Sequence, residues 1–69
     1  MASKVAKVIE IVGTSETSIA DAVKGAVKTA SETVRNIQWV EVTQIRAAVE
    51  DDKVDHFQVM MKIGFGVEK

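Results

Sequence analysis

The sequence predicts an α+β domain with the element order strand, helix, strand, strand, and two patterns carry that prediction. From Phe57 to Val67 every second residue is apolar and the residues between them are mostly polar, as in a strand with one core-facing side. Between Thr17 and Arg35, apolar and small residues instead recur at steps of three and four, which is typical of an amphipathic helix. Residues 1–69 are predicted to form a single domain.

The length of the chain predicts self-association. A domain of 69 residues buries only about 60% of the surface that its unfolded form exposes, so it is marginally stable alone. Disulfides, bound metals or oligomerisation usually reinforce such small domains. The sequence has no cysteine, and its one histidine without cysteine partners makes a poor structural metal site. We therefore expect a homo-oligomer and no metal site, and the lack of cysteine fits a cytoplasmic location.

Charge and hydropathy argue against two classes of partner. The net charge is −1 and both signs are mixed along the chain, so the sequence lacks the basic stripe that nucleic acid requires. No stretch approaches the roughly 20 apolar residues that cross a bilayer, and the start of the chain lacks the apolar segment of a secretory signal. We expect a cytoplasmic protein that binds neither nucleic acid nor membrane.

The first predicted strand runs from Val5 to Val12, a segment rich in β-branched residues. Lys7 and Glu10 fall on opposite faces of this strand. Charges on both faces favour an edge strand, or a strand that is partly covered on each side.

The helix is predicted to follow the segment Gly13–Ser15. The glycine is expected to end the first strand, and Thr14 or Ser15 to cap the helix by accepting its free amide hydrogens. Glu16 then lies in the first turn, where the helix dipole favours an anion. The helix itself is expected over about Thr17–Arg35, and Asn36 is expected to terminate it in a left-handed conformation.

Two further strands are predicted, from Gln38 to Val49 and from Val54 to Val67, joined by an acidic turn at residues 50–53. If the sheet is antiparallel throughout, the third strand lies between the other two, which gives the strand order 1-3-2. The helix then packs on one face of this three-stranded antiparallel sheet. The opposite face has no cover within the chain.

A turn centred on Asp51 and Asp52 predicts that the second and third strands pair residues whose numbers sum to 103. In this register most apolar side chains share the face that the helix covers, whereas a shift by one residue would expose them. The expected pairs are Val40 with Ile63, Val42 with Met61, Gln44 with Val59, Trp39 with Gly64, Glu41 with Lys62, Thr43 with Met60 and Ile45 with Gln58.

The same register raises a problem at Arg46, which falls opposite Phe57 on the core face. A charge is unfavourable there, so we expect a bulge near Gln44–Arg46 that turns the arginine outward.

Trp39 is the candidate ligand-contacting residue. The register places it on the uncovered face opposite Gly64, which leaves space for its ring, and next to Gln58. A flat ring beside an amide on a bare sheet face indicates a planar ligand or another subunit.

Three segments of the chain carry a family resemblance: IEIVGTS at Ile9–Ser15, NIQWVEV at Asn36–Val42 followed by Ile45 and Arg46, and HFQVMMKIGF at His56–Phe65. Together they resemble the dodecin family, and the resemblance spans nearly the whole chain in length, order and spacing. It implies a small non-enzymatic flavoprotein whose βαββ protomers form a hollow homododecamer, with flavins stacked between tryptophans at a two-fold subunit contact. The implied function is flavin storage and photoprotective sequestration.

The resemblance also implies roles for individual residues. Trp39 would stack on the flavin ring, Gln58 would hydrogen-bond its pyrimidine-like edge, and Arg46 would lie near the ligand's phosphate or side chain. The arginine favours the bacterial type and hence FMN, with riboflavin as the other flavin and coenzyme A as a further ligand of some members. Gly66 departs from relatives that carry arginine or a larger residue there, so no coenzyme A contact is carried over to it.

No residue set supplies a nucleophile with a base or a pair of carboxylates with a shared target, so no catalytic residue and no enzyme activity are predicted. His56 is interpreted as interfacial or solvated, and Arg46 either as a phosphate ligand or as half of an inter-subunit ion pair. Two other functions stay open. One is a regulatory module that senses a small ligand, and the other is a cofactor-free structural oligomer in which Trp39 packs across the subunit contact.

Overall fold

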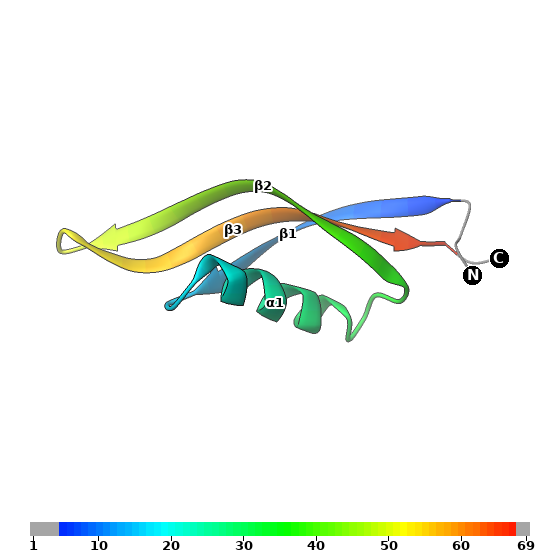
Figure 1. The fold of residues 1–69 in the computed structure, drawn as a ribbon, viewed down its shortest axis with the longest axis horizontal. Helices are drawn as coiled ribbons and strands as arrows, with labels where there is room; N and C mark the ends of the chain where they lie inside the picture. The colour runs from blue at the N-terminus through cyan, green and yellow to red at the C-terminus, as the bar shows by residue number, and fades with distance from the viewer. Residues whose placement is uncertain (1–4, 68–69) are drawn as a thin grey trace.

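In the computed structural model, which describes residues 5–67, the chain forms one three-stranded sheet and one helix (Figure 1). β3 lies between β1 and β2, and both pairings are antiparallel. The predicted α+β class, the element order and the strand order 1-3-2 are confirmed. The elements are β1 (Ala6–Ser15), α1 (Ile19–Ala30), β2 (Ile37–Glu50) and β3 (Lys53–Gly66).

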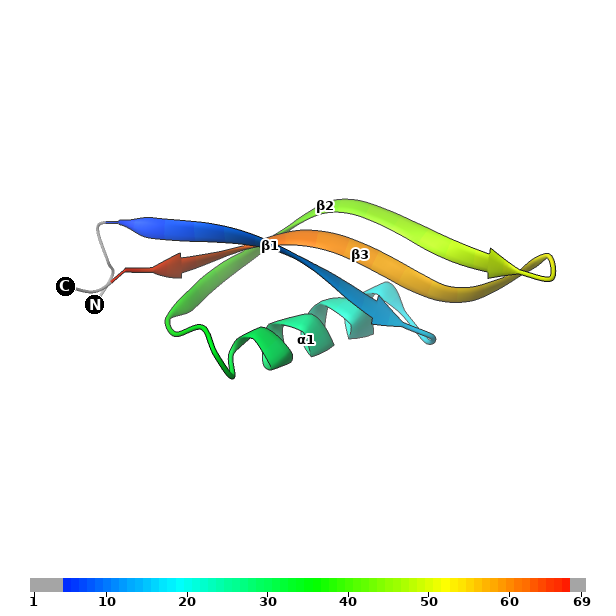
Figure 2. The same ribbon diagram turned by 180° about the vertical axis from the view of Figure 1, so that it is seen from behind.

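Helix α1 packs against β1 and β3 on one face of the sheet, as Figures 1 and 2 show from opposite sides. The core is centred on β3, where Val59, Met61 and Ile63 are fully buried, and Ala22 of α1 packs onto it. The alternating pattern therefore predicts the core correctly. Phe57 and other apolar residues towards the strand ends are only partly buried, because the helix does not reach them.

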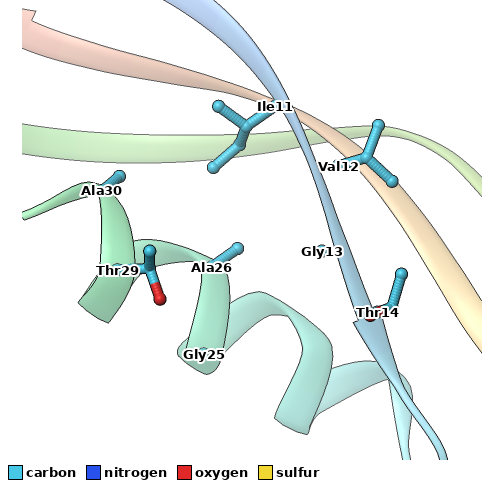
Figure 3. Close-up of a pocket in the computed structure, with 8 residues that line it drawn as sticks. All are labelled: Ile11, Val12, Gly13, Thr14, Gly25, Ala26, Thr29 and Ala30. Carbon is cyan, nitrogen blue, oxygen red and sulfur yellow. The ribbon is translucent and has the colours of Figure 1, made fainter.

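Strand β1 is longer than predicted, because it continues through Gly13 to Ser15 and does not end at Val12. Gly13 lies beside Ala26 of the helix (Figure 3). A Cβ atom at Gly13 would lie 2.5 Å from the Ala22 carbonyl oxygen and 2.9 Å from the Ala26 Cβ. The glycine thus permits a close approach between helix and strand and does not break the strand. An open groove of about 430 Å³ lies beside this contact, between β1 and α1.

Helix α1 also begins later than predicted. Its N-cap is Ser18, whose hydroxyl oxygen accepts the Asp21 amide hydrogen at 2.9 Å, and neither Thr14 nor Ser15 caps it. Ser15 instead stabilises the loop before the helix, because its hydroxyl oxygen accepts the amide hydrogens of Thr17 and Ser18. The acidic residue in the first turn is Asp21, not Glu16.

The helix ends at Ala30, well before the predicted Arg35. Ser31 explains the early end, because its hydroxyl donates to the Lys28 carbonyl oxygen at 2.6 Å and competes with the helical pattern. The chain then makes tight turns, including a bond from the Thr33 amide to the Ala30 carbonyl. Asn36 does have a positive φ of 62°, as predicted, but it leads the chain into β2 and does not terminate the helix.

The register of β2 and β3 follows the sum of 103 next to the turn and again from Val42 to Trp39. It is shifted between these two stretches and once more at Ile37, which pairs with Phe65. Trp39 pairs with Gly64 and Glu50 pairs with Lys53, as the sum of 103 predicts. The hairpin turn is made by Asp51 and Asp52, whose φ angles of 53° and 62° belong to a two-residue turn. The confirmed pairs also include Val40 with Ile63, Glu41 with Lys62 and Val42 with Met61.

Two bulges account for the wrong pairs. Away from the turn, Asp55 is the first extra residue, on β3, and beyond it the numbers of paired residues sum to 104. Thr43 is a second extra residue, on β2, and beyond it the sum returns to 103. The expected bulge is therefore present, just before Gln44, and it turns Arg46 away from the core as predicted. In place of the predicted partners, Gln44 pairs with Met60, Ile45 with Val59, Arg46 with Gln58 and Ala47 with Phe57.

The protomer is elongated, with extents of 51 × 19 × 15 Å. Its radius of gyration is 14.0 Å, whereas a compact domain of this length has about 11 Å. The β2–β3 hairpin projects beyond the helix (Figures 1 and 2). Many large apolar side chains are therefore between 41% and 65% exposed, namely Val5, Val8, Val12, Trp39, Val42, Ile45, Val49 and Val54.

We expect Gly13→Ala to destabilise the protein by about 1–3 kcal/mol, because the new methyl group would collide with the helix backbone. Gly25→Ala is the matched control. Nothing lies within 4 Å of a Cβ at Gly25, so this change should stabilise the helix by up to about 1 kcal/mol. Urea unfolding at one protein concentration, followed by circular dichroism, measures both. A Gly13→Ala protein as stable as the parent would contradict the close packing.

Candidate functional site

The face of the sheet opposite α1 carries the candidate site. Ile11 and Val40 pack against the core on the helix side, so their neighbours along each strand point to the other face. The strand pairings arrange this bare face in rows with β3 in the middle. The rows are Val8–Gly64–Trp39, Glu10–Lys62–Glu41, Val12–Met60–Gln44 and Thr14–Gln58–Arg46.

Trp39 lies directly over Gly64, as the sequence predicts. A Cβ atom on Gly64 would overlap the indole atoms Cδ2, Cε2 and Cζ2, so only glycine leaves room for the ring. The backbone of β3 supports one side of the indole, and Trp39 is still 43% exposed. A supported and half-exposed ring can offer its free face to another flat ring.

At the other end of the bare face, four polar side chains form a continuous chain of hydrogen bonds. Arg46 Nε donates to Gln58 Oε1 at 2.5 Å. Gln58 Nε2 lies 3.0 Å from His56 Nε2, and His56 Nδ1 lies 2.8 Å from Asp55 Oδ2. We name this chain, from Arg46 to Asp55, the polar relay.

The polar relay brings together two predicted site residues, Gln58 and Arg46, through the one-residue register shift. It also contains His56, which sequence reasoning treated only as interfacial or solvated. The sequence does indicate that His56 lies beside Gln58, because residues two apart in a strand share a face. The contribution of Asp55 was not visible in the sequence, since its reach towards His56 depends on the bulge.

The structure corrects one central expectation, that Trp39 lies next to Gln58. Trp39 sits over Gly64, and Gly64 is six residues from Gln58 along β3, which corresponds to about 20 Å. Sharing a face does not make the indole and the carboxamide neighbours. One flat heterocycle can touch both groups only if they come from different copies of the chain.

Within residues 5–67, no group of three or more His, Cys, Asp or Glu side chains is arranged to hold a metal ion. The helix in this part of the chain is also too short to span a bilayer.

The chain is thus a long βαββ protomer whose helix-free sheet face carries Trp39. A sequence model of the Dodecin family matches residues 5–68, so the chain belongs to the dodecin family. This confirms the resemblance inferred from the three sequence segments.

Known dodecins are similar over nearly the whole chain. The dodecin of Thermus thermophilus is 38% identical over 66 residues, which are 96% of each chain. The structure of dodecin from Streptomyces coelicolor is 46% identical with a TM-score of 0.90, covering 94% of this chain and 93% of that one. A calcium dodecin from Mycobacterium tuberculosis, described with a novel calcium-binding site, is 31% identical with a TM-score of 0.82 and covers the same shares.

We expect Gly64→Ala to displace the indole of Trp39 from the sheet, because the added methyl group would occupy the position of the ring. Trp39 is the one tryptophan of the chain, so its fluorescence reports this change directly. The emission should shift to longer wavelength and become easier to quench with acrylamide. Gly25→Ala, which should leave the spectrum unchanged, is the control. Unaltered emission from the Gly64→Ala protein would show that the indole does not rest on the glycine.

Proposed function

We propose that this dodecin is a non-enzymatic flavin-binding protein that stores FMN or riboflavin between copies of its own chain and shields the flavin from light. The observation that carries the proposal is the half-exposed indole of Trp39, supported by Gly64 on the sheet face that α1 leaves bare. Such a ring is suited to stacking on a planar heterocycle.

Stacking on one indole is too weak to hold a flavin. By analogy with base–aromatic stacking, it contributes on the order of 1–3 kcal/mol. A micromolar dissociation constant requires about 8 kcal/mol. The remainder must come from a second ring and from polar anchors. Two flavins stacked on each other between the Trp39 rings of two copies, the arrangement that the family resemblance implies, supply the second ring.

Gln58 can act as a polar anchor even though the polar relay already uses part of its carboxamide. An amide has two N–H donors and two acceptor lone pairs on its oxygen. Arg46 uses one lone pair and His56 takes one N–H, so a donor and an acceptor remain for the mixed edge of a flavin. Because of the distance along β3, this anchor must serve a flavin that stacks on the Trp39 of another copy.

Self-association is the second part of the proposal. The elongated protomer and its exposed apolar side chains need cover that the described chain does not provide. The subunit number of twelve follows from the family resemblance. Coenzyme A is proposed as a further ligand from the family resemblance, and a cytoplasmic location from the lack of cysteine.

A flavin enclosed between two indoles, or between an indole and a second flavin, exposes neither face of its ring to a substrate. This geometry is unsuited to hydride transfer, and it favours rapid quenching of the excited flavin by electron transfer. Storage and photoprotection therefore fit the site better than catalysis.

The first test is titration with FMN, whose fluorescence should be strongly quenched at a ratio near one flavin per chain. Trp39→Ala should weaken binding by about tenfold or more, because it removes a stacking contact. Trp39→Phe retains a flat ring and should lose less. Lys24→Ala, on the exposed side of α1, is the control and should bind as the parent does.

Persistent bright flavin emission at saturating protein would contradict the proposed function. Size-exclusion chromatography of each variant distinguishes the cofactor-free alternative. If Trp39→Ala dissociates the assembly, the indole is a packing residue of the subunit contact.

Arg46→Ala tests whether the arginine contacts the phosphate of the ligand. If it does, the variant should lose affinity for FMN by about tenfold and keep its affinity for riboflavin, which lacks the phosphate. Equal losses for both flavins would indicate that Arg46 acts only through its hydrogen bond to Gln58. Arg46→Lys keeps the charge without the planar fork and serves as the conservative comparison.

A further inference from the structure

We propose that His56 is a positioning residue that fixes the orientation of the Gln58 carboxamide, so that flavin affinity falls when the His56 ring becomes protonated. The inference rests on the proposed function, because Gln58 and Arg46 are the polar anchors assigned there. It extends that function by giving the site a pH dependence that ring stacking alone does not produce.

The two ends of the polar relay determine the direction of every hydrogen bond within it. Arg46 can only donate, so the group of Gln58 that faces it must be the carbonyl oxygen. The amide nitrogen of Gln58 then faces His56 Nε2, and an amide nitrogen can only donate. His56 Nε2 must therefore be the unprotonated acceptor.

The other end of the polar relay agrees with this assignment. Asp55 Oδ2 lies 2.8 Å from His56 Nδ1, and an ionised carboxylate can only accept. The proton of the neutral imidazole thus sits on Nδ1. All three hydrogen bonds of the polar relay are satisfied together only with this single tautomer.

The bulge in β3 makes the polar relay possible. Adjacent residues of a regular strand point to opposite faces, so Asp55 would not normally reach the ring of His56. Asp55 is the extra residue between the pairs Ala48–His56 and Val49–Val54. A bulge re-aims side chains, and here it places a carboxylate against the imidazole.

Protonation of His56 breaks this pattern. The imidazolium carries a hydrogen on Nε2, so two donors would face each other between His56 and Gln58. Rotating the carboxamide by half a turn relieves that contact but turns its amide nitrogen towards Arg46, which is also a donor. In either orientation one hydrogen bond is lost, and the groups that Gln58 offers to a ligand are displaced or exchanged.

Three charged groups lie near the His56 ring. Asp55 on β3 contacts it, Arg46 on β2 reaches it through Gln58, and Glu16 after β1 lines the same small pocket together with Thr14 and Ser15. Carboxylates and guanidinium groups normally keep their charge between about pH 5 and 8, whereas histidine changes its charge in this range. His56 is the one histidine of the chain, and the His56→Gln variant tests whether a pH effect in that window depends on its ring.

Riboflavin is the appropriate probe, because the phosphate of FMN itself titrates near pH 6. Fluorescence titration of the intact assembly should give an affinity that falls about fivefold from about pH 8 to pH 5.5, the effect of losing one hydrogen bond. His56→Gln offers a carbonyl acceptor that does not titrate, and should keep the high-pH affinity at both values. His56→Lys offers only donors and should bind weakly at both.

Glu16→Gln, which should retain the parent's pH profile, is the control for the other carboxylate in the pocket. A parent protein with the same riboflavin affinity at both pH values would overturn the positioning role while leaving flavin binding intact. So would a His56→Gln protein that loses affinity at low pH as the parent does. No quenching of riboflavin by the parent at any pH would instead remove the proposed function, and the positioning role with it.

A second measurement tests the polar relay without a flavin. Nitrogen-15 NMR of the labelled protein near pH 8 should show His56 as the neutral tautomer with its proton on Nδ1. A proton on Nε2 would contradict the assigned direction of the hydrogen bonds, whatever the flavin titrations give.

Discussion

The rest of the structure depends on one constraint, that α1 is too short to cover the sheet on which it packs. Its 12 residues extend over about 18 Å, whereas the 14 residues of β2 or β3 extend over about 46 Å. Even on its own side the helix leaves the projecting hairpin bare, and the opposite face has no cover within residues 5–67. This explains why so few side chains are fully buried and why the protomer is elongated. In the proposed assembly, other copies of the chain supply the missing cover.

The same constraint decides what kind of site the chain can build. A lone chain separates the indole of Trp39 from the carboxamide of Gln58 by most of the bare face, so neither group alone makes a pocket. Stacking and polar anchoring meet only when copies of the chain come together. Under the proposed function, ligand binding and assembly are coupled, since a flavin bound at the contact would favour the assembled state by mass action.

Sequence reasoning predicted the fold because its signals are local. Alternation identified β3, the step of three and four identified the helix, and the turn at Asp51 and Asp52 set the register that pairs Trp39 with Gly64. The bulge expected near Arg46 is present at Thr43, whereas the bulge at Asp55 was not predicted, because the two shifts cancel and Trp39 still pairs with Gly64. The sequence wrongly predicts a strand end at Gly13. The glycine is needed because the helix backbone packs closely against it, and such a tertiary contact leaves no local sequence pattern. The separation of about 20 Å along β3 between Gln58 and the position of Trp39 was not predicted, because two residues on one face of a sheet need not be neighbours. The identity of the proposed ligand, a flavin, rests on the family resemblance.

The most direct test of this account is a crystal structure of the assembled protein grown with riboflavin. The account predicts a flavin ring stacked on the Trp39 of one copy, with its pyrimidine-like edge hydrogen-bonded to the Gln58 of another. A structure in which protein side chains cover the exposed face of Trp39, leaving no room for a flat ring between copies, would contradict it.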